Sequence, residues 1–190
     1  MAKINKRAQE VFGMSFSMIF AIILIIFIIA VAFFAIKHFV GLSKCTNVGL
    51  FYDDLREKVR DAWSSSSGRY EADFTAKIPK KGLFGTGIEY ICFGKLIDTP
   101  SDATSTDIKE KLINEYLFDP SSEYNVFAYP PDKGCDSGLG AIVLKCGSAD
   151  CVNTKDSTGA SQFFCKPVAD DGSITVNLRK KSQDYQITLW

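Results

Sequence analysis

Histidine and net charge are the first things that this sequence lacks. His38 is the only histidine, and 22 lysines and arginines balance 22 aspartates and glutamates. A single histidine beside an apolar segment is typical of a membrane-interface edge, and it does not favour Ser-His-Asp or Cys-His catalysis. A balanced charge gives no overall field that would attract nucleic acid. We therefore expect neither an enzyme nor a nucleic-acid partner.

Charge is also missing from one long segment near the N-terminus. No charged side chain occurs between Glu10 and Lys37, and residues 14–36 are almost entirely apolar. As a helix, roughly 23 residues span about 34 Å, enough for a hydrocarbon core of about 30 Å. A cleaved secretory signal has an apolar region of only about 7–15 residues, followed by small residues. We expect a permanent single-pass helix in the cell membrane, apolar all round and without the polar stripe of a pore. The residues that we assign to this membrane anchor are Met14, Phe20, Ile25, Phe27 and Ile36.

Basic residues flank the apolar segment unequally. Lys3, Lys6 and Arg7 precede it, and Lys37 and Lys44 follow it. The positive-inside rule therefore favours a cytoplasmic N-terminus and an extracellular C-terminal domain. We expect three regions: a cytoplasmic leader (residues 1–13), a transmembrane helix (residues 14–40) and an extracellular domain (residues 41–190).

Cysteine is absent from the N-terminal side of the apolar segment. An even number of cysteines on one side of a membrane is typical of disulfide bonds in an oxidising exterior, although sequence does not choose among fifteen pairings. The alternative is a four-thiolate zinc site in residues 135–165, but the paired CxxC spacing of such sites is missing. We expect disulfides and no metal or cofactor. The disulfide candidates are Cys45, Cys92, Cys135, Cys146, Cys151 and Cys165.

The five residues before the apolar segment read Lys-Arg-Ala-Gln-Glu. This motif resembles the class III signal of archaeal type IV pilins and archaellins, in which a basic and a small residue, here Arg7 and Ala8, precede a cytoplasmic cut, often before Gln, here Gln9. The resemblance covers about the first 35 residues. It implies cleavage between Ala8 and Gln9 and a retained helix that packs with its copies in a filament core. The alternative is a plain signal anchor that is never cut.

Amphipathic and alternating patterns fill the rest of the chain. Residues 48–63 show helical spacing, with Thr46 or Asn47 as the expected cap; the alternative is that this helix is continuous with the apolar one through a kink near residues 41–49. A short helix follows Ser105 or Thr106. Strands are expected at residues 70–78 and 88–93, joined by a turn, and Ala169-Asp170-Asp171-Gly172 is a hairpin signal. The remaining expected strands cover residues 124–129, 141–146, 161–168, 173–180 and 185–190.

These patterns predict an α+β fold. A transmembrane helix is followed by an amphipathic helix that packs on a mainly antiparallel β-sheet, which is the layout of pilin-like subunits. The function that we expect is a structural or adhesion subunit whose partners are the lipid bilayer and copies of itself, with no predicted ligand. The alternative is a permanently anchored surface binding protein, or an accessory subunit of a membrane complex, with no filament role.

Overall fold

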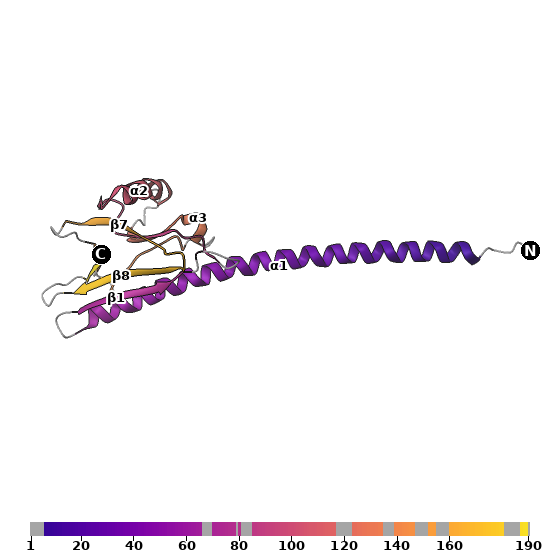
Figure 1. Ribbon diagram of the computed structural model, residues 1–190, viewed down its shortest axis with the longest axis horizontal. Helices are drawn as coiled ribbons and strands as arrows, with labels where there is room; N and C mark the ends of the chain where they lie inside the picture. Colours follow the sequence, from indigo (N-terminus) through magenta and orange to yellow (C-terminus); the bar gives the residue numbers. More distant parts are fainter. Residues whose placement is uncertain are drawn as a thin grey trace, which may run out of the picture. The chain divides into compact units, whose positions relative to one another are not determined.

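The protein consists of two compact units that share one long helix. The computed structural model describes residues 6–65, 70–78, 80, 85–116, 123–134, 139–146, 152–154, 160–180 and 187–189. The chain divides into Met1–Val40 and Gly41–Trp190, and helix α1 (Lys6–Ser64) contributes residues to both. The fold is α+β, and most of its strand pairs are antiparallel (Figure 1). This part of the fold prediction is confirmed.

The C-terminal part of α1 is amphipathic and its apolar face is buried. Apolar residues recur every three or four positions, which places them on one face of the helix. Phe51 lies against Phe74, with 6.0 Å between the ring centroids. The charged residues between them are exposed. The buried set, none more than 2% exposed, consists of Val48, Phe51, Tyr52, Leu55, Val59 and Ala62.

The predicted helix start at Thr46 or Asn47 is wrong. Helix α1 continues through both residues, and the Thr46 hydroxyl donates to the Leu42 carbonyl oxygen, 3.0 Å away. A threonine side chain can bond the carbonyl four residues back as well as cap a helix. A threonine is therefore compatible with both the interior and the start of a helix.

The first sheet has four strands in the order β1-β8-β9-β6. Its members are β1 (Tyr70–Lys77), β6 (Val152–Asn153), β8 (Ser173–Lys180) and β9 (Ile187–Leu189). β1 and β8 are antiparallel over their whole length, with Phe74 opposite Val176. Among the described strands, β1 is the terminal member of this sheet and pairs with β8.

The second sheet has five strands in the order β3-β7-β2-β4-β5. Its members are β2 (Tyr90–Phe93), β3 (Thr99–Pro100), β4 (Val126–Tyr129), β5 (Ala141–Ile142) and β7 (Gln162–Pro167). The two strands expected at residues 70–78 and 88–93 are present, but they lie in different sheets: β1 pairs with β8, while β2 pairs with β4 and β7. The expectation of a single sheet is corrected in the same way.

The five-stranded sheet is buried on both faces. Alternate residues of a strand point to opposite faces. In β2, Ile91 and Phe93 join a core with the buried face of α1 and with the first sheet, whereas Cys92 joins a second core with Ile108 and Leu112 of α2 (Ala103–Tyr116). In Gly41–Trp190 the layers thus run from α1 through the sheets to α2 (Figure 1).

Helix α2 begins one turn earlier than the sequence suggests. Asp102 is its cap: the Ser105 backbone N–H donates to Asp102 Oδ1 at 2.8 Å. Ser105, expected as a cap, is instead fully buried, and its hydroxyl accepts a hydrogen bond from the Cys165 backbone N–H at 3.1 Å. Aspartate and serine are both preferred N-caps, so the pattern alone could not choose between them. Ser105 therefore links α2 to β7.

Two turns change the course of the chain. The Gly172 N–H donates to the Ala169 carbonyl oxygen at 2.9 Å, which confirms a tight turn at residues 169–172, but the strands that flank it, β7 and β8, belong to different sheets. Gly94 follows β2 with a φ of 112°, and a Cβ there would lie 2.6 Å from the Gln162 carbonyl oxygen. Only glycine fits this position without strain. A short helix, α3 (Pro131–Gly134), follows a cis peptide bond between Tyr129 and Pro130.

Candidate functional site

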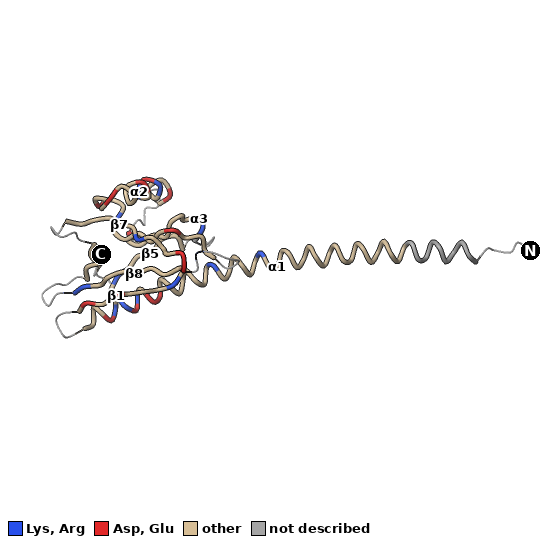
Figure 2. Tube along the Cα trace, viewed as in Figure 1, with Lys and Arg blue, Asp and Glu red and all other residues tan. Residues whose placement is uncertain are grey.

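Helix α1 presents an apolar surface that the described residues do not cover. Every residue of residues 16–39 is exposed, and no lysine, arginine, aspartate or glutamate interrupts this stretch before Lys37 (Figure 2). Among the described residues, α1 is the one helix long and apolar enough to cross a membrane. The backbone N–H and C=O groups of a helix pair with each other, so a helix needs no hydrogen bonds from lipid, which offers none. This stretch is suited to a lipid or helical environment.

The predicted anchor residues lie within this helix. Phe20, Ile25, Phe27 and Ile36 are 59%, 55%, 67% and 56% exposed. Met14 belongs to α1 as well, but the description of side chains begins at Phe16. The large side chains in the stretch are therefore available to an environment outside the chain.

The predicted processing residues lie at the start of the same helix. Arg7, Ala8 and Gln9 follow Lys6, where α1 begins. A helical cleavage segment would have to unwind before a peptidase could act, because proteolysis needs the backbone of the cut bond to be accessible.

Exposed leucines continue past the length that a membrane requires. In Gly41–Trp190, Leu42 and Leu50 are 57% and 56% exposed, and Thr46 between them is exposed as well. A spacing of four places all three on one side of the helix. The sequence analysis did not identify this strip, because it considered the region only as a helix start or a kink, although the spacing is readable in the sequence. We call Leu42, Thr46 and Leu50 the leucine strip.

The cysteines form disulfides where they are described. Cys92 on β2 and Cys165 on β7 are opposite each other in the strand register and are joined by a disulfide. Cys45 and Cys146 are also disulfide-bonded, and Cys135 and Cys151 lie outside the described residues. The zinc alternative is contradicted, because two of its four thiolates, Cys146 and Cys165, are occupied by disulfides. The described residues contain no group of three or more histidine, cysteine, aspartate or glutamate side chains placed to hold a metal ion.

An open groove lies between α1 and the outer strand of the first sheet. Its volume is about 470 Å³, and three of its lining residues are acidic while one is a lysine. The buried Phe74 is also among its lining residues. We call this the β1 groove, and the residues that line it are Asp54, Glu57, Lys58, Asp73, Phe74 and Thr75.

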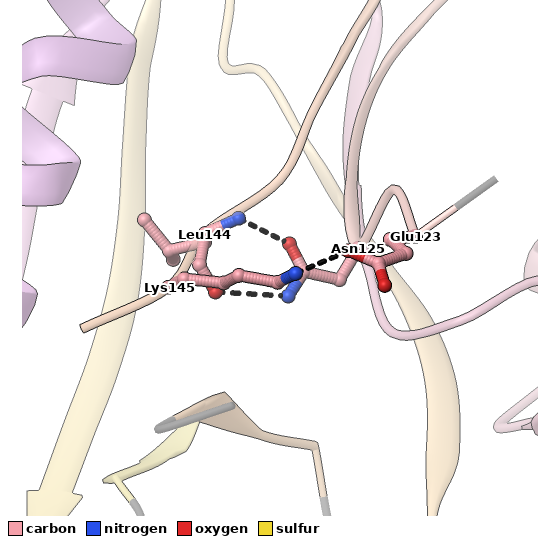
Figure 3. Close-up of polar contacts among 4 residues, drawn as sticks. All are labelled: Glu123, Asn125, Leu144 and Lys145. Atoms are coloured by element: carbon pink, nitrogen blue, oxygen red, sulfur yellow. Dashed lines mark hydrogen bonds and ion pairs between the residues drawn. The ribbon is translucent and has the colours of Figure 1, made fainter. Parts of the chain in front are cut away.

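Asn125 fixes the end of the five-stranded sheet. Its side chain accepts from the Leu144 N–H at 2.7 Å and donates to the Leu144 carbonyl oxygen at 3.1 Å (Figure 3). Both residues are buried, so these bonds satisfy backbone groups that β5 no longer pairs. An exposed ion pair between Lys145 and Glu123 lies beside them. Asn125 thus has a structural role.

Hydrogen bonding and burial shift the pKa values of several groups in the described part of Gly41–Trp190. Hydrogen bonding from the Ser105 backbone lowers the pKa of Asp102, which holds its carboxylate charged at the α2 cap. Burial raises the pKa of Tyr116 to about 12 and also raises that of Tyr52, so both phenols stay protonated at neutral pH. The Tyr52 hydroxyl is buried without a hydrogen-bond partner among the described residues. None of these groups is arranged as a general base.

No family model, no curated protein and no solved structure matches the chain closely enough to indicate kinship.

Proposed function

We propose that the protein is a single-pass surface protein of the type IV pilin-like kind, a structural or adhesion subunit. The N-terminus is cytoplasmic in this proposal, and Gly41–Trp190 lies outside the cell. Cleavage between Ala8 and Gln9 releases the leader, after which α1 leaves the lipid and packs against copies of itself. A long apolar helix whose C-terminal part packs on β-sheets supports a pilin-like layout.

The observation that carries the filament role is the exposure of the leucine strip. Residues 14–36 are long enough for the hydrocarbon core. Leu42 and Leu50 lie beyond that length, and each is more than half exposed. Covering a leucine side chain is worth about 1.5–3 kcal/mol, so a neighbouring helix that covers both would contribute substantially to assembly. A lone anchor gains nothing from this strip.

The second candidate, a permanently anchored binding protein or accessory subunit, is favoured by the β1 groove. That groove belongs to Gly41–Trp190 and needs no cleavage or filament. The two candidates differ in whether the chain is cut and whether it assembles.

The first test is mass spectrometry of the mature N-terminus in the native host. The filament proposal expects a chain that starts at Gln9. Arg7→Glu should block the cut, whereas the matched charge reversal Lys3→Glu should leave it intact. A purified native chain that still carries residues 3–9 would overturn the filament proposal and leave the anchored binding protein.

The second test concerns assembly. Leu50→Glu should abolish high-mass assemblies sheared from the cell surface, because it places a charge in the helix contact. Ile97→Glu is the control, since Ile97 is 84% exposed but lies on a loop outside α1. Equal loss of assemblies in both variants, or in neither, would contradict a role for the leucine strip.

Orientation is tested with an impermeant thiol probe on intact cells after mild reduction. Labelling of the domain cysteines before lysis supports an extracellular Gly41–Trp190. Labelling only after lysis would place the domain inside the cell.

A further inference from the structure

Helix α1 carries a basic pair and an acidic pair of residues with the same spacing. Lys37 and Lys44 are seven residues apart. Asp54 and Asp61, further along the helix, are also seven residues apart. Seven residues make about two helical turns, so the two members of each pair share one side of a helix. No other two basic residues of α1, and no other two acidic residues, have this spacing.

The two pairs cannot meet within one chain. Lys37 and Asp54 are 17 residues apart in the same helix, which places them about 25 Å apart along its axis. Lys37, Asp54 and Asp61 are exposed, and Lys44 is half-buried. Among the described residues, none forms an ion pair with any of these four side chains. Their charges are therefore available to a partner outside the chain.

A second copy of α1 supplies charges of the opposite sign at the same spacing. If the copy is parallel and displaced by 17 residues, Lys37 of one helix lies opposite Asp54 of the other. The same displacement sets Lys44 opposite Asp61. Every other displacement of parallel α1 helices leaves at least one of the two lysines without an acidic residue opposite it. Complementary charges across an interface fix its register, so they favour this displacement.

This displacement also brings together two exposed apolar side chains. Phe33 lies four residues before Lys37, and Leu50 lies four residues before Asp54. A spacing of four keeps each of them on the side of the helix that carries its charged pair. Phe33 is 66% exposed and Leu50 is 56% exposed. A displacement of 17 residues sets Phe33 of one copy opposite Leu50 of the other, so an apolar contact accompanies the charge pairs.

We propose that α1 binds a parallel second copy of α1 displaced by 17 residues, through the pairs Phe33–Leu50, Lys37–Asp54 and Lys44–Asp61. The inference rests on the proposed filament function and adds the register of its helix contact. The two surfaces differ, so the contact is heterologous. Each copy offers its basic side to one neighbour and its acidic side to another, and such contacts continue into an open assembly.

Cysteine cross-linking on intact cells tests the register. The variant carries both Phe33→Cys and Leu50→Cys, and the described native cysteines are disulfide-bonded and contribute no thiol. After mild oxidation, sheared assemblies should give a ladder of covalent oligomers on a denaturing gel, because each copy is linked to two neighbours. Either substitution alone should give no ladder. The matched control, Phe34→Cys with Leu50→Cys, should give at least about tenfold less oligomer, because Phe34 lies about 100° further round the helix.

Charge exchange tests the ion pairs independently of the cysteines. Lys37→Glu alone and Asp54→Lys alone should each reduce sheared assemblies about tenfold or more, because like charges then face each other at every contact. The two substitutions together should restore assembly. The matched control combines Lys37→Glu with Asp53→Lys and should not restore it, since Asp53 pairs with Arg56 of its own helix at 3.2 Å.

Carbodiimide cross-linking of unmodified assemblies keeps the test decisive if a variant misfolds. This reagent joins a lysine to a carboxylate in contact with it, and mass spectrometry should find the peptide that links Lys37 to Asp54. Cross-links from Lys37 only to other carboxylates would overturn the register.

The remaining outcomes separate the register from the filament function. Sheared assemblies without a ladder, or without restoration by charge exchange, would overturn the register and leave the filament function standing. Covalent dimers from Leu50→Cys alone would overturn it as well, because they would mean that one surface meets itself in a symmetric contact. An absence of sheared assemblies from the unmodified chain would overturn the filament function and this register together.

Discussion

The two units of the molecule use the same apolar side chains in opposite ways. In Met1–Val40 every residue from Phe16 to Phe39 is exposed, whereas in the part of α1 that belongs to Gly41–Trp190, Leu55 is fully buried. The domain covers Leu55 and Val59 with its own strands, whereas the described residues provide no such cover for residues 16–39. Hydrophobicity alone therefore does not identify a core. The decisive question is whether the chain carries a partner for each apolar face.

The disulfide between β2 and β7 gives the largest expected effect on this comparison, because it concerns only the self-covered unit. Replacing both Cys92 and Cys165 by alanine opens a loop with a sequence separation of 73 residues. Loop-closure entropy then predicts a loss of about 4 kcal/mol in the free energy of unfolding of Gly41–Trp190. Urea unfolding followed by tryptophan fluorescence, in detergent, measures this loss. The helical far-UV signal of α1 in detergent should persist above the urea midpoint, and simultaneous loss of that signal would contradict two independent units.

Leu55 and Leu50 allow covered and uncovered apolar side chains to be compared within one helix, α1. Leu55→Ala removes a fully buried side chain and should destabilise the domain by about 2–5 kcal/mol. Leu50→Ala, at a position 56% exposed, should change the free energy of unfolding by no more than about 0.5 kcal/mol. Thermal unfolding of both variants in detergent checks the difference. Equal losses would mean that Leu50 contributes to the domain core and is not a free contact surface.

Substitution of Asn125 tests whether side chains of the domain supply hydrogen bonds that its buried backbone groups need. Asn125→Ala leaves the buried N–H and C=O of Leu144 without the side-chain partners that they now have, which should cost about 2 kcal/mol. Asn125→Asp keeps the acceptor but replaces the donor by an oxygen that repels the Leu144 carbonyl, so it should not restore stability. Urea midpoints of the two variants measure this. A midpoint unchanged in Asn125→Ala would show that water replaces the amide.

Asp102 gives the smallest effect, and one that depends on pH. Asp102→Ala removes the α2 cap and should cost about 1 kcal/mol at pH 7, while Asp102→Asn should retain most of that stability. The folded-state pKa of Asp102 is lowered, so its stabilisation is fully present above the ordinary carboxyl pKa of about 3.9 and is lost as pH falls through the lower folded value. The wild-type advantage over Asp102→Ala should therefore shrink below about pH 4. An advantage that stays constant down to pH 2 would contradict the role of the charged form.

The helices and most strands were predictable because their signals are local. The i, i+3, i+4 spacing from Val48 to Ala62 and the alternation in β8 are visible in short windows of sequence. β3 and β6 were missed because each has only two residues, too few for alternation to register. The sequence did not decide between a helix start at Thr46 and a helix that continues through it, because a threonine can bond within a helix as well as at its start.

Strand pairing and the β1 groove could not be predicted from the sequence, because they join segments that are far apart along the chain. β1 pairs with β8, with Thr75 and Thr175 directly opposite each other and 100 residues apart, whereas turn signals report only neighbours along the chain. The choice of Cys92 with Cys165 follows from the β2–β7 register, which composition does not reveal. Asp54 and Asp73 meet at one groove only because Phe51 packs on Phe74.

The contact between β8 and α1 joins segments that are synthesised far apart in time. Lys180 on β8 donates to the carbonyl of Trp63 near the end of α1, across 117 residues of sequence. A ribosome adds about 5–20 residues per second, so the apolar face of α1 emerges several seconds before β8 exists to help cover it. Contacts of such high contact order form late. Leu55 and Val59, which are buried in the folded domain, are therefore synthesised well before the strand that helps to cover the apolar face of α1.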